Sequence, residues 1–267
     1  MPFPMTPNPL IRQLEELYRK YNRKCYVHPD PLEFLYRYED VRDREVVGFV
    51  AAALAYGNVT QILKSVEAAL GRMGASPREY LDGSCPADFF HDFDGFVHRF
   101  ATGRHMAAML TGIKGMLATH GSLMEGFAAG CRETDATYLS ALNRFAGAIR
   151  ALSGESDPGH LIAMPDKGSA CKRLNLFLRW MIRGDDVDPG GWEPLSPSKL
   201  VIPLDTHMFR ICGSLGFTCR KQANAKAALE VTAAFSRLIP EDPVRYDFVL
   251  TRQGIRRDEA FGLGNAC

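Results

Sequence analysis

The sequence has almost no net charge, no long apolar run and no leader pattern. Its 32 Lys and Arg residues are matched by 31 Asp and Glu residues, so a nucleic-acid site would have to be a local patch. No stretch approaches the ~20 apolar residues that a membrane-spanning helix needs. The N-terminus carries prolines and no long apolar run, unlike a signal peptide. We expect a cytoplasmic protein with no membrane partner.

Cysteine and histidine are present but are not arranged as metal ligands. The seven cysteines are an odd number, are widely scattered and include no Cys-x-x-Cys pair. This pattern is typical of a reducing compartment and argues against a zinc ribbon or a disulfide framework. The histidines also lack a metal-binding spacing such as His-x-x-x-His. We predict no metal site.

Strand-like alternation is nearly absent, whereas helical periodicity runs through the chain. Hydrophobic residues make up 46% of the sequence, enough for a sizeable core. Only the short stretch Lys199–Leu204 alternates with a period of two residues. Apolar residues recur at helical spacing in residues 8–22, 41–56, 59–73, 104–119, 137–152, 171–183, 206–216, 223–238 and 242–252. The predicted fold class is all-α.

One stretch joins an apolar run to an acid at the expected start of a helix. Pro203 disfavours helix in the residue before it. Asp205 is a good helix N-cap, and apolar residues then recur at helical spacing from Met208 onward. By itself this pattern predicts only that Asp205 caps a core helix.

A second segment lies upstream, and the two segments together form a pattern that resembles a known family. The segment that contains Asp205 is residues 203–210 (Pro-Leu-Asp-Thr-His-Met-Phe-Arg). The upstream segment is residues 168–175 (Gly-Ser-Ala-Cys-Lys-Arg-Leu-Asn), and Lys172 and Asp205 are separated by 205 − 172 = 33 positions. Together they resemble the catalytic segments of the helix-hairpin-helix DNA glycosylases, the endonuclease III superfamily. The spacing is most like the archaeal 8-oxoguanine DNA glycosylase branch. The layout is also similar to that of a bacterial family of unassigned function.

The resemblance implies a two-lobed helical fold with the site in the cleft between the lobes. Residues 41–160 would form the middle lobe, and residues 1–40 plus 161–267 the second lobe with a degenerate helix-hairpin-helix. Residues 184–198, rich in glycine and proline, are then a surface excursion rather than a linker between independent domains. Many relatives end in four cysteines that hold an iron–sulfur cluster. Here only Cys267 follows Cys219, so we expect no cofactor.

The resemblance also implies the chemistry of two residues. Lys172 would attack the sugar carbon of a damaged nucleotide, and Asp205 would stabilise the positive charge that develops as the base leaves. The resulting imine permits strand cleavage by β-elimination. The competing interpretations are a solvated Lys172 in a first helical turn and an Asp205 that only caps. Lys167 is a rival nucleophile, but the register with Asn175 favours Lys172.

Further positions are expected to hold DNA. Backbone N–H groups of the hairpin would bind a phosphate without reading sequence. Gly168 fits this role, whereas Ala170 stands where the family has a second glycine. Lys167, Arg173 and Arg179 would add positive charge, although Lys167 and Arg179 are equally well explained as ordinary solvated residues.

Six positions are candidates for contact with the base. Each has a structural alternative: a helix–helix turn with Asn58 as its N-cap for the first three, a core aromatic for the next two, and an acid at a helix N-terminus for the last. They are Tyr56, Asn58, Gln61, Phe177, Trp180 and Asp247. Thr251 stands where the archaeal branch has an aromatic that stacks on the base. Trp192, in the excursion, would wedge DNA, close a pocket or anchor its loop.

The sequence therefore favours a monomeric base-excision repair glycosylase with AP-lyase activity. Its partner would be double-stranded DNA carrying a damaged base, for example an oxidised purine, or an abasic site. In a bacterium it would associate with the nucleoid. The alternatives are a non-catalytic module that binds DNA or RNA structure, and an unrelated all-α interaction protein. The last is separated by geometry, because Lys172 and Asp205 must converge on one cleft in either of the others.

Overall fold

The computed structural model describes residues 9–256 and is almost entirely helical, which confirms the predicted fold class. The α-helices are α1 Pro9–Tyr21, α2 Val41–Leu54, α3 Val59–Met73, α4 Pro77–Gly83, α5 Pro86–Asp92, α6 Gly103–His120, α7 Leu123–Ala128, α8 Leu139–Leu152, α9 Lys172–Ile182, α10 Thr206–Ser214, α11 Ala225–Leu238 and α12 Asp247–Arg256. Single 3-10 segments lie at Lys24–Tyr26, Pro31–Arg37, Gly159–Leu161, Pro165–Lys167 and Pro197–Lys199. Each of the nine segments with helical periodicity overlaps one of these α-helices, and the largest difference is at α12, which begins five residues later than the predicted segment 242–252 and ends four residues beyond it.

The elements that periodicity missed are the short ones. Helices α4, α5 and α7 have six or seven residues, too few for an apolar face to repeat. Two-residue strands, β1 Val97–His98 and β2 Ala101–Thr102, pair antiparallel as a small hairpin ahead of α6. Neither strand is long enough to show alternation.

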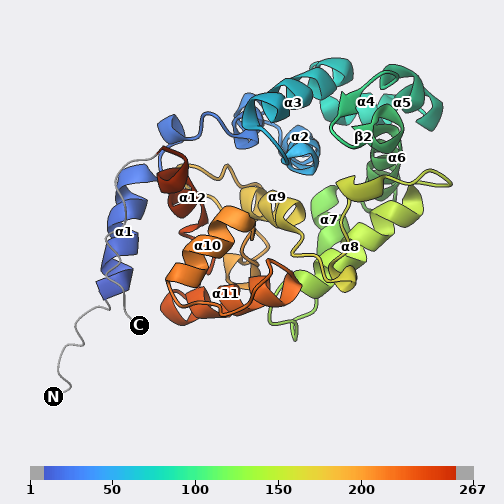
Figure 1. The fold of residues 1–267 in the computed structure, drawn as a ribbon. Helices are drawn as coiled ribbons and strands as arrows, with labels where there is room; N and C mark the ends of the chain where they lie inside the picture. The colour runs from blue at the N-terminus through green and yellow to red at the C-terminus, as the bar shows by residue number, and fades with distance from the viewer. Residues whose placement is uncertain (1–8, 257–267) are drawn as a thin grey trace.

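Helices α2 and α9 lie between two groups of helices (Figure 1). Helices α3 to α6 lie on one side, and α10 to α12 with α1 on the other. Helix α2 is buried from Glu45 to Leu54, and its Phe49 meets Phe177 of α9 edge to face at 5.2 Å between ring centroids. One continuous cluster of buried apolar side chains joins residues from α1 to α12. The position of α9 at this junction matters because Lys172 is its first residue.

Residues 184–198 fold back onto α9 as a surface excursion, as expected. The backbone N–H of Trp192 donates to Met181 O at 2.9 Å, and that of Gly190 donates to Trp180 O at 3.0 Å. The Trp192 side chain is completely buried, and its Nε1 donates to the Glu45 carboxylate at 3.2 Å. Of the three roles considered for Trp192, the structure assigns loop anchoring and leaves no ring to wedge DNA.

No helix among residues 9–256 combines the length and the apolar character that crossing a bilayer requires.

Candidate active site

A loop with two left-handed residues delivers Lys172 to the start of α9. Gly168 has φ = 81° and Cys171 has φ = 46°. A positive φ is cheap for glycine but costs energy for cysteine, and such strain concentrates at functional positions. The preceding element is only the 3-10 turn Pro165–Lys167, so the segment that resembles a helix-hairpin-helix in sequence forms a turn, a loop and a helix here.

Asp205 caps α10 and still has an oxygen to spare. Its Oδ1 accepts from the backbone N–H groups of His207 at 2.9 Å and Met208 at 2.8 Å. Its Oδ2 lies 3.9 Å from Lys172 Nζ. The carboxylate is therefore a cap on one side and the partner of an amine on the other, so the two interpretations of Asp205 are compatible.

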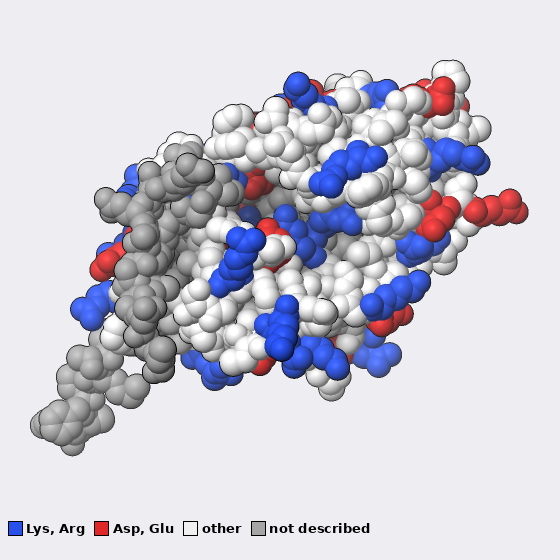
Figure 2. All heavy atoms as spheres, in the orientation of Figure 1, with Lys and Arg blue, Asp and Glu red and all other residues white. Residues whose placement is uncertain are grey.

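Lys172 and Asp205 line one cavity of about 510 Å³, together with side chains that are mostly small or apolar. The other lining residues are Ala55, Tyr56, Gly57, Ile62, Leu161, Ala163, Ser169, Ala170, Cys171, Arg173, Leu174, Leu204 and Ala223. The two charged side chains are 31% and 39% exposed, so solvent and a ligand can both reach them. The same view as Figure 1, drawn with all atoms, shows a hollow with basic and acidic side chains within it and basic side chains around it (Figure 2).

Tyr56 forms part of the cavity wall and is held by hydrogen bonds on both sides. Its hydroxyl donates to His98 O at 2.8 Å and therefore accepts from His160 Nε2, also at 2.8 Å. The Arg173 guanidinium lies 4.8 Å from the Tyr56 ring centroid and donates to the carbonyl oxygens of Ala53 and His160. Arg173 thus lines the cavity, but these carbonyl bonds would compete with the phosphate that it is expected to bind.

Asn58 and Gln61, which were also expected to contact the base, do not line this cavity. Asn58 caps α3, accepting from the N–H groups of Thr60 at 3.0 Å and Gln61 at 3.4 Å. Gln61 is exposed and donates from Nε2 to Ser65 Oγ at 3.3 Å. The capping interpretation of Asn58 is confirmed.

The loop that is expected to bind a phosphate has only part of the expected character. Lys167 and Gly168 are exposed beside the cavity, where they can meet a DNA strand. Ala170 is buried, with 8% of its surface exposed, and its carbonyl accepts from Asn175 Nδ2 at 3.0 Å. Its Cβ occupies the place where a second glycine would let a backbone approach.

Three of the residues expected to contact a base are enclosed by protein, which corrects that prediction. The aromatic rings of Phe177 and Trp180 are completely buried. Phe177 packs against Phe49 and Trp192, so it belongs to the contact between α2 and α9. Asp247 is 2% exposed, and its Oδ2 accepts from Arg179. The core interpretation of both rings is confirmed, and Asp247 serves an internal ion pair.

Asp247 belongs to a buried ionic network behind the cavity. The network joins α9 to the excursion and to α12 through Arg179, Arg183, Asp185, Asp188, Asp242 and Asp247. Four carboxylates share two guanidinium groups. Burial raises the pKa of Asp247 to about 6, and Arg179 only partly offsets this effect. Sequence reasoning did not find this network, because a residue pattern does not show which charged side chains are buried together.

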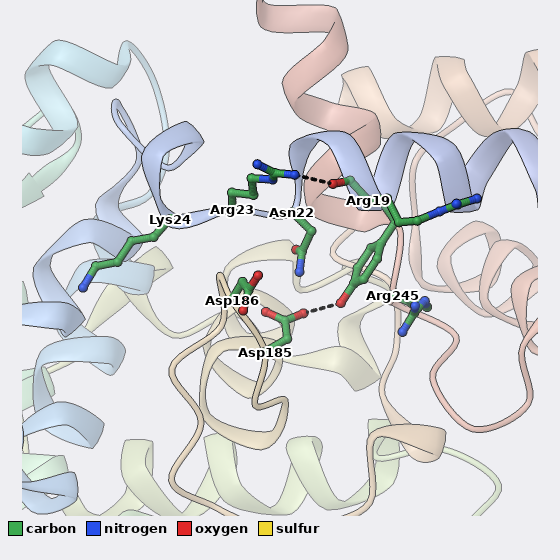
Figure 3. Close-up of a pocket in the computed structure, with 8 residues that line it drawn as sticks. Arg19, Asn22, Arg23, Lys24, Asp185, Asp186 and Arg245 are labelled. Carbon is green, nitrogen blue, oxygen red and sulfur yellow. Dashed lines mark hydrogen bonds between the residues drawn. The ribbon is translucent and has the colours of Figure 1, made fainter.

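A second hollow, of about 770 Å³, lies between the end of α1 and the excursion (Figure 3). Arg19, Arg23 and Lys24 border it, opposite Asp185 and Asp186. Asp185 is already bonded to Tyr18 Oη at 2.8 Å and to Arg183 at 2.8 Å. This hollow is larger but contains no amine and carboxylate in contact, so the Lys172 cavity is the better candidate.

No group of three or more His, Cys, Asp or Glu side chains suited to a metal ion occurs within residues 9–256. Cys267, which bears on the expected absence of an iron–sulfur cluster, lies outside the described residues.

Comparison with known families and proteins adds a family but no named relative. The model of the family described as "Protein of unknown function (DUF2400)" matches residues 30–256, most of the chain, so the chain belongs to that family. No curated protein and no solved structure matches it. The matched range contains both Lys172 and Asp205.

Proposed function

We propose that this member of the DUF2400 family is a DNA glycosylase with AP-lyase activity, in which Lys172 is the nucleophile and Asp205 the assisting carboxylate. One observation carries the proposal: Lys172 Nζ and Asp205 Oδ2 are 3.9 Å apart in a shared cavity, although 33 positions separate them in sequence. Two charged residues without a shared role would be expected to lie on separate parts of the surface.

The chemistry follows from the placement of the two groups. The carboxylate is positioned to take a proton from the ammonium group, which frees an electron pair on Nζ. That pair forms a bond to the sugar C1′ while the bond from C1′ to the base nitrogen breaks, and the base departs with the bonding electrons and a proton. Asp205 also stabilises the positive charge that builds on the sugar. An existing abasic site enters later, when its aldehyde condenses with the amine and releases water.

Strand cleavage is the second half of the reaction. The sugar ring opens to give an imine between Nζ and C1′. Loss of a proton from C2′ then expels the 3′ phosphate oxygen with its bonding electrons. Water hydrolyses the remaining imine and restores the lysine. Capping fixes the orientation of Asp205, because its Oδ1 is bonded to two backbone N–H groups.

The surroundings support DNA as the substrate. In the expected two-lobed fold, the cavity is the cleft that would receive an extruded nucleotide. Lys167 and the N–H groups of the loop at residues 168–170 lie next to Lys172, where a phosphate of the same strand would pass. We keep the predictions of a cytoplasmic, monomeric protein that works without a cofactor.

A non-catalytic module that binds DNA or RNA structure is the second candidate. The burial of Phe177, Trp180 and Asp247 favours it, because these side chains leave the cavity without its expected base contacts. This candidate requires no bond to Lys172.

A cleavage assay separates the two candidates. Labelled duplexes carrying 8-oxoguanine, uracil, hypoxanthine or an abasic site are incubated with wild type, Lys172→Gln and Asp205→Asn. The proposal predicts cleavage of at least the abasic duplex by wild type and none by Lys172→Gln. Binding of the duplexes without cleavage of any of them would support the non-catalytic module.

A further inference from the structure

The hairpin formed by β1 and β2 exposes an aromatic side chain beside the candidate site. Phe100 is 71% exposed and Val97 is 64% exposed, the highest values for large apolar side chains among residues 9–256. Apolar surface that is gathered in one place marks contact sites, whereas single scattered apolar residues are ordinary on a protein surface. The two residues lie on the tip and one strand of a hairpin only six residues long.

The hairpin is fixed to the wall of the cavity. Tyr56 Oη donates to His98 O at 2.8 Å, and His98 Nε2 donates back to Tyr56 O at 3.2 Å. His98 is 1% exposed, and its Nδ1 is 2.9 Å from Ser65 Oγ. These reciprocal bonds tie β1 to the turn that begins at Tyr56, which lines the cavity of Lys172. The hairpin tip therefore has a defined position relative to the lysine.

Both tip residues face toward that wall. Arg99 has φ = 53°, and its side chain covers Gly57: a Cβ added there would come within 2.7 Å of it. Gly57 itself lines the cavity. The Phe100 ring is 6.2 Å from the ring of His160, whose Nε2 is bonded to Tyr56. Phe100 is thus connected to the cavity through the side chains of His160 and Tyr56.

The charge around the hairpin suits a polyanion. Residues 95–106, which form the hairpin and the first turn of α6, contain no Asp or Glu but include Arg99 and Arg104. The Arg99 guanidinium lies 5.4 Å from the Phe100 ring centroid, so a cation and an aromatic face are presented together. Such a pairing fits a base stack with its phosphates: the ring enters between bases and the cation meets the backbone. An acidic protein surface would match the charge but would give the ring no stack to enter.

We propose that Phe100 is a wedge that inserts into the base stack of duplex DNA next to a nucleotide held over Lys172, with Arg99 on the adjacent phosphate. The inference rests on the proposed function, because it takes DNA as the substrate. It adds a residue that acts on the DNA and not on the reacting bonds. The wedge fills the gap left when a nucleotide leaves the stack, which makes extrusion less costly.

The test uses binding, so that it does not depend on lysine chemistry. The probe is a duplex with a tetrahydrofuran abasic analogue, which has no aldehyde to react with Lys172, flanked by 2-aminopurine as a fluorescent stacking reporter. Phe100→Ala is compared with wild type, with Phe100→Trp and with Leu152→Ala. Leu152 is 37% exposed on α8 and serves as the matched apolar control. Because Phe100 is so exposed, its removal should leave the thermal unfolding curve unchanged.

The wedge predicts that Phe100→Ala binds the analogue duplex about five- to a hundredfold more weakly, the range for losing one base–aromatic stack. It should also lose the 2-aminopurine fluorescence change, whereas Phe100→Trp and Leu152→Ala should behave like wild type. Equal binding by Phe100→Ala and wild type would overturn the wedge and leave the lyase proposal standing. The wedge would also be overturned if Phe100→Ala bound the duplex like wild type but bound an acidic protein surface more weakly than wild type. Absence of duplex binding by wild type would overturn the wedge together with the proposed function.

Discussion

Helix α9 carries two ionic sites that differ in almost every physical respect. At its first residue, Lys172 meets Asp205 at 3.9 Å with both side chains about one-third exposed. Two turns later, Arg179 meets Asp188 at 3.0 Å with 4% and 0% exposure. The first pair is open, long and linked to few neighbours. The second is enclosed and shares its partners with Arg183 and Asp247.

The open pair is suited to react with a ligand, whereas the buried network is suited to hold α9 in place. An exposed ion pair adds little stability, because water competes for both charges. A buried network is costly to break, because each removed partner leaves an unpaired charge in a dry interior. The network fixes α9 against the excursion and α12, and in doing so it fixes the position of Lys172.

The largest effect should come from breaking the buried network. Asp188→Ala leaves Arg179 and Arg183 without a shared partner, and it should lower the free energy of unfolding by roughly 3–5 kcal/mol in chemical denaturation. The matched exposed pair is Arg37–Glu67, at 2.9 Å with 48% and 60% exposure. Glu67→Ala should cost less than about 1 kcal/mol. Similar costs for the two variants would refute the distinction between open and enclosed pairs.

A smaller effect should appear in the pH dependence of stability. The folded-state pKa of Asp247 is raised to about 6, above the ~3.9 of an unfolded chain. Between these values the folded protein binds more protons than the unfolded one, so this carboxyl contributes stability that is present below pH 4 and lost as the pH rises through 6. The loss should be of order 3 kcal/mol.

Asp247→Asn cannot titrate and should lack this loss. The measurement is the free energy of unfolding of both proteins from pH 4 to pH 7.5, expressed as the difference between them. Wild type should become less stable relative to the variant as the pH rises. A difference that stays flat, or that changes in the opposite direction, would show that Arg179 and not burial dominates the titration of Asp247.

The open site should respond least in stability. Asp205→Asn keeps a side-chain oxygen that can cap α10, so the free energy of unfolding should change by only about a few tenths of a kcal/mol in a thermal unfolding experiment. Asp205→Ala removes the cap and should cost about 1 kcal/mol. Cleavage should be lost in both variants, because an amide cannot take a proton from Lys172. An active Asp205→Asn enzyme would reduce Asp205 to a cap.

Helix content and the central pair could be predicted from the sequence, whereas the side chains around them could not. Periodicity located α3 and α8 because one apolar face recurs over four turns. The segments at Lys172 and Asp205 carried a resemblance, and the structure brings the two residues together. The prediction that Phe177 and Trp180 contact the base was wrong for a physical reason. Periodicity shows that the two residues share a helix, but not which neighbours cover their side chains.

The excursion and the hairpin show the same limit. Glycine and proline in residues 184–198 predicted a loop, but only the three-dimensional contacts reveal that Trp192 is bonded to Glu45. The hairpin at Phe100 was not expected, because its strands have two residues each. One available signal was the presence of Arg99 and Arg104 without any Asp or Glu in residues 95–106, which indicates local positive charge.

The central claim is that the amine of Lys172 bonds to the sugar, and borohydride trapping tests it most directly. Wild type is incubated with an abasic duplex and the reductant, and the modified peptide is located by mass spectrometry, with Lys172→Gln and the neighbouring Lys167→Gln alongside. We predict an adduct on Lys172 that is lost in Lys172→Gln and kept in Lys167→Gln. An adduct on Lys167, or none on any lysine although the duplex is bound, would contradict the assignment.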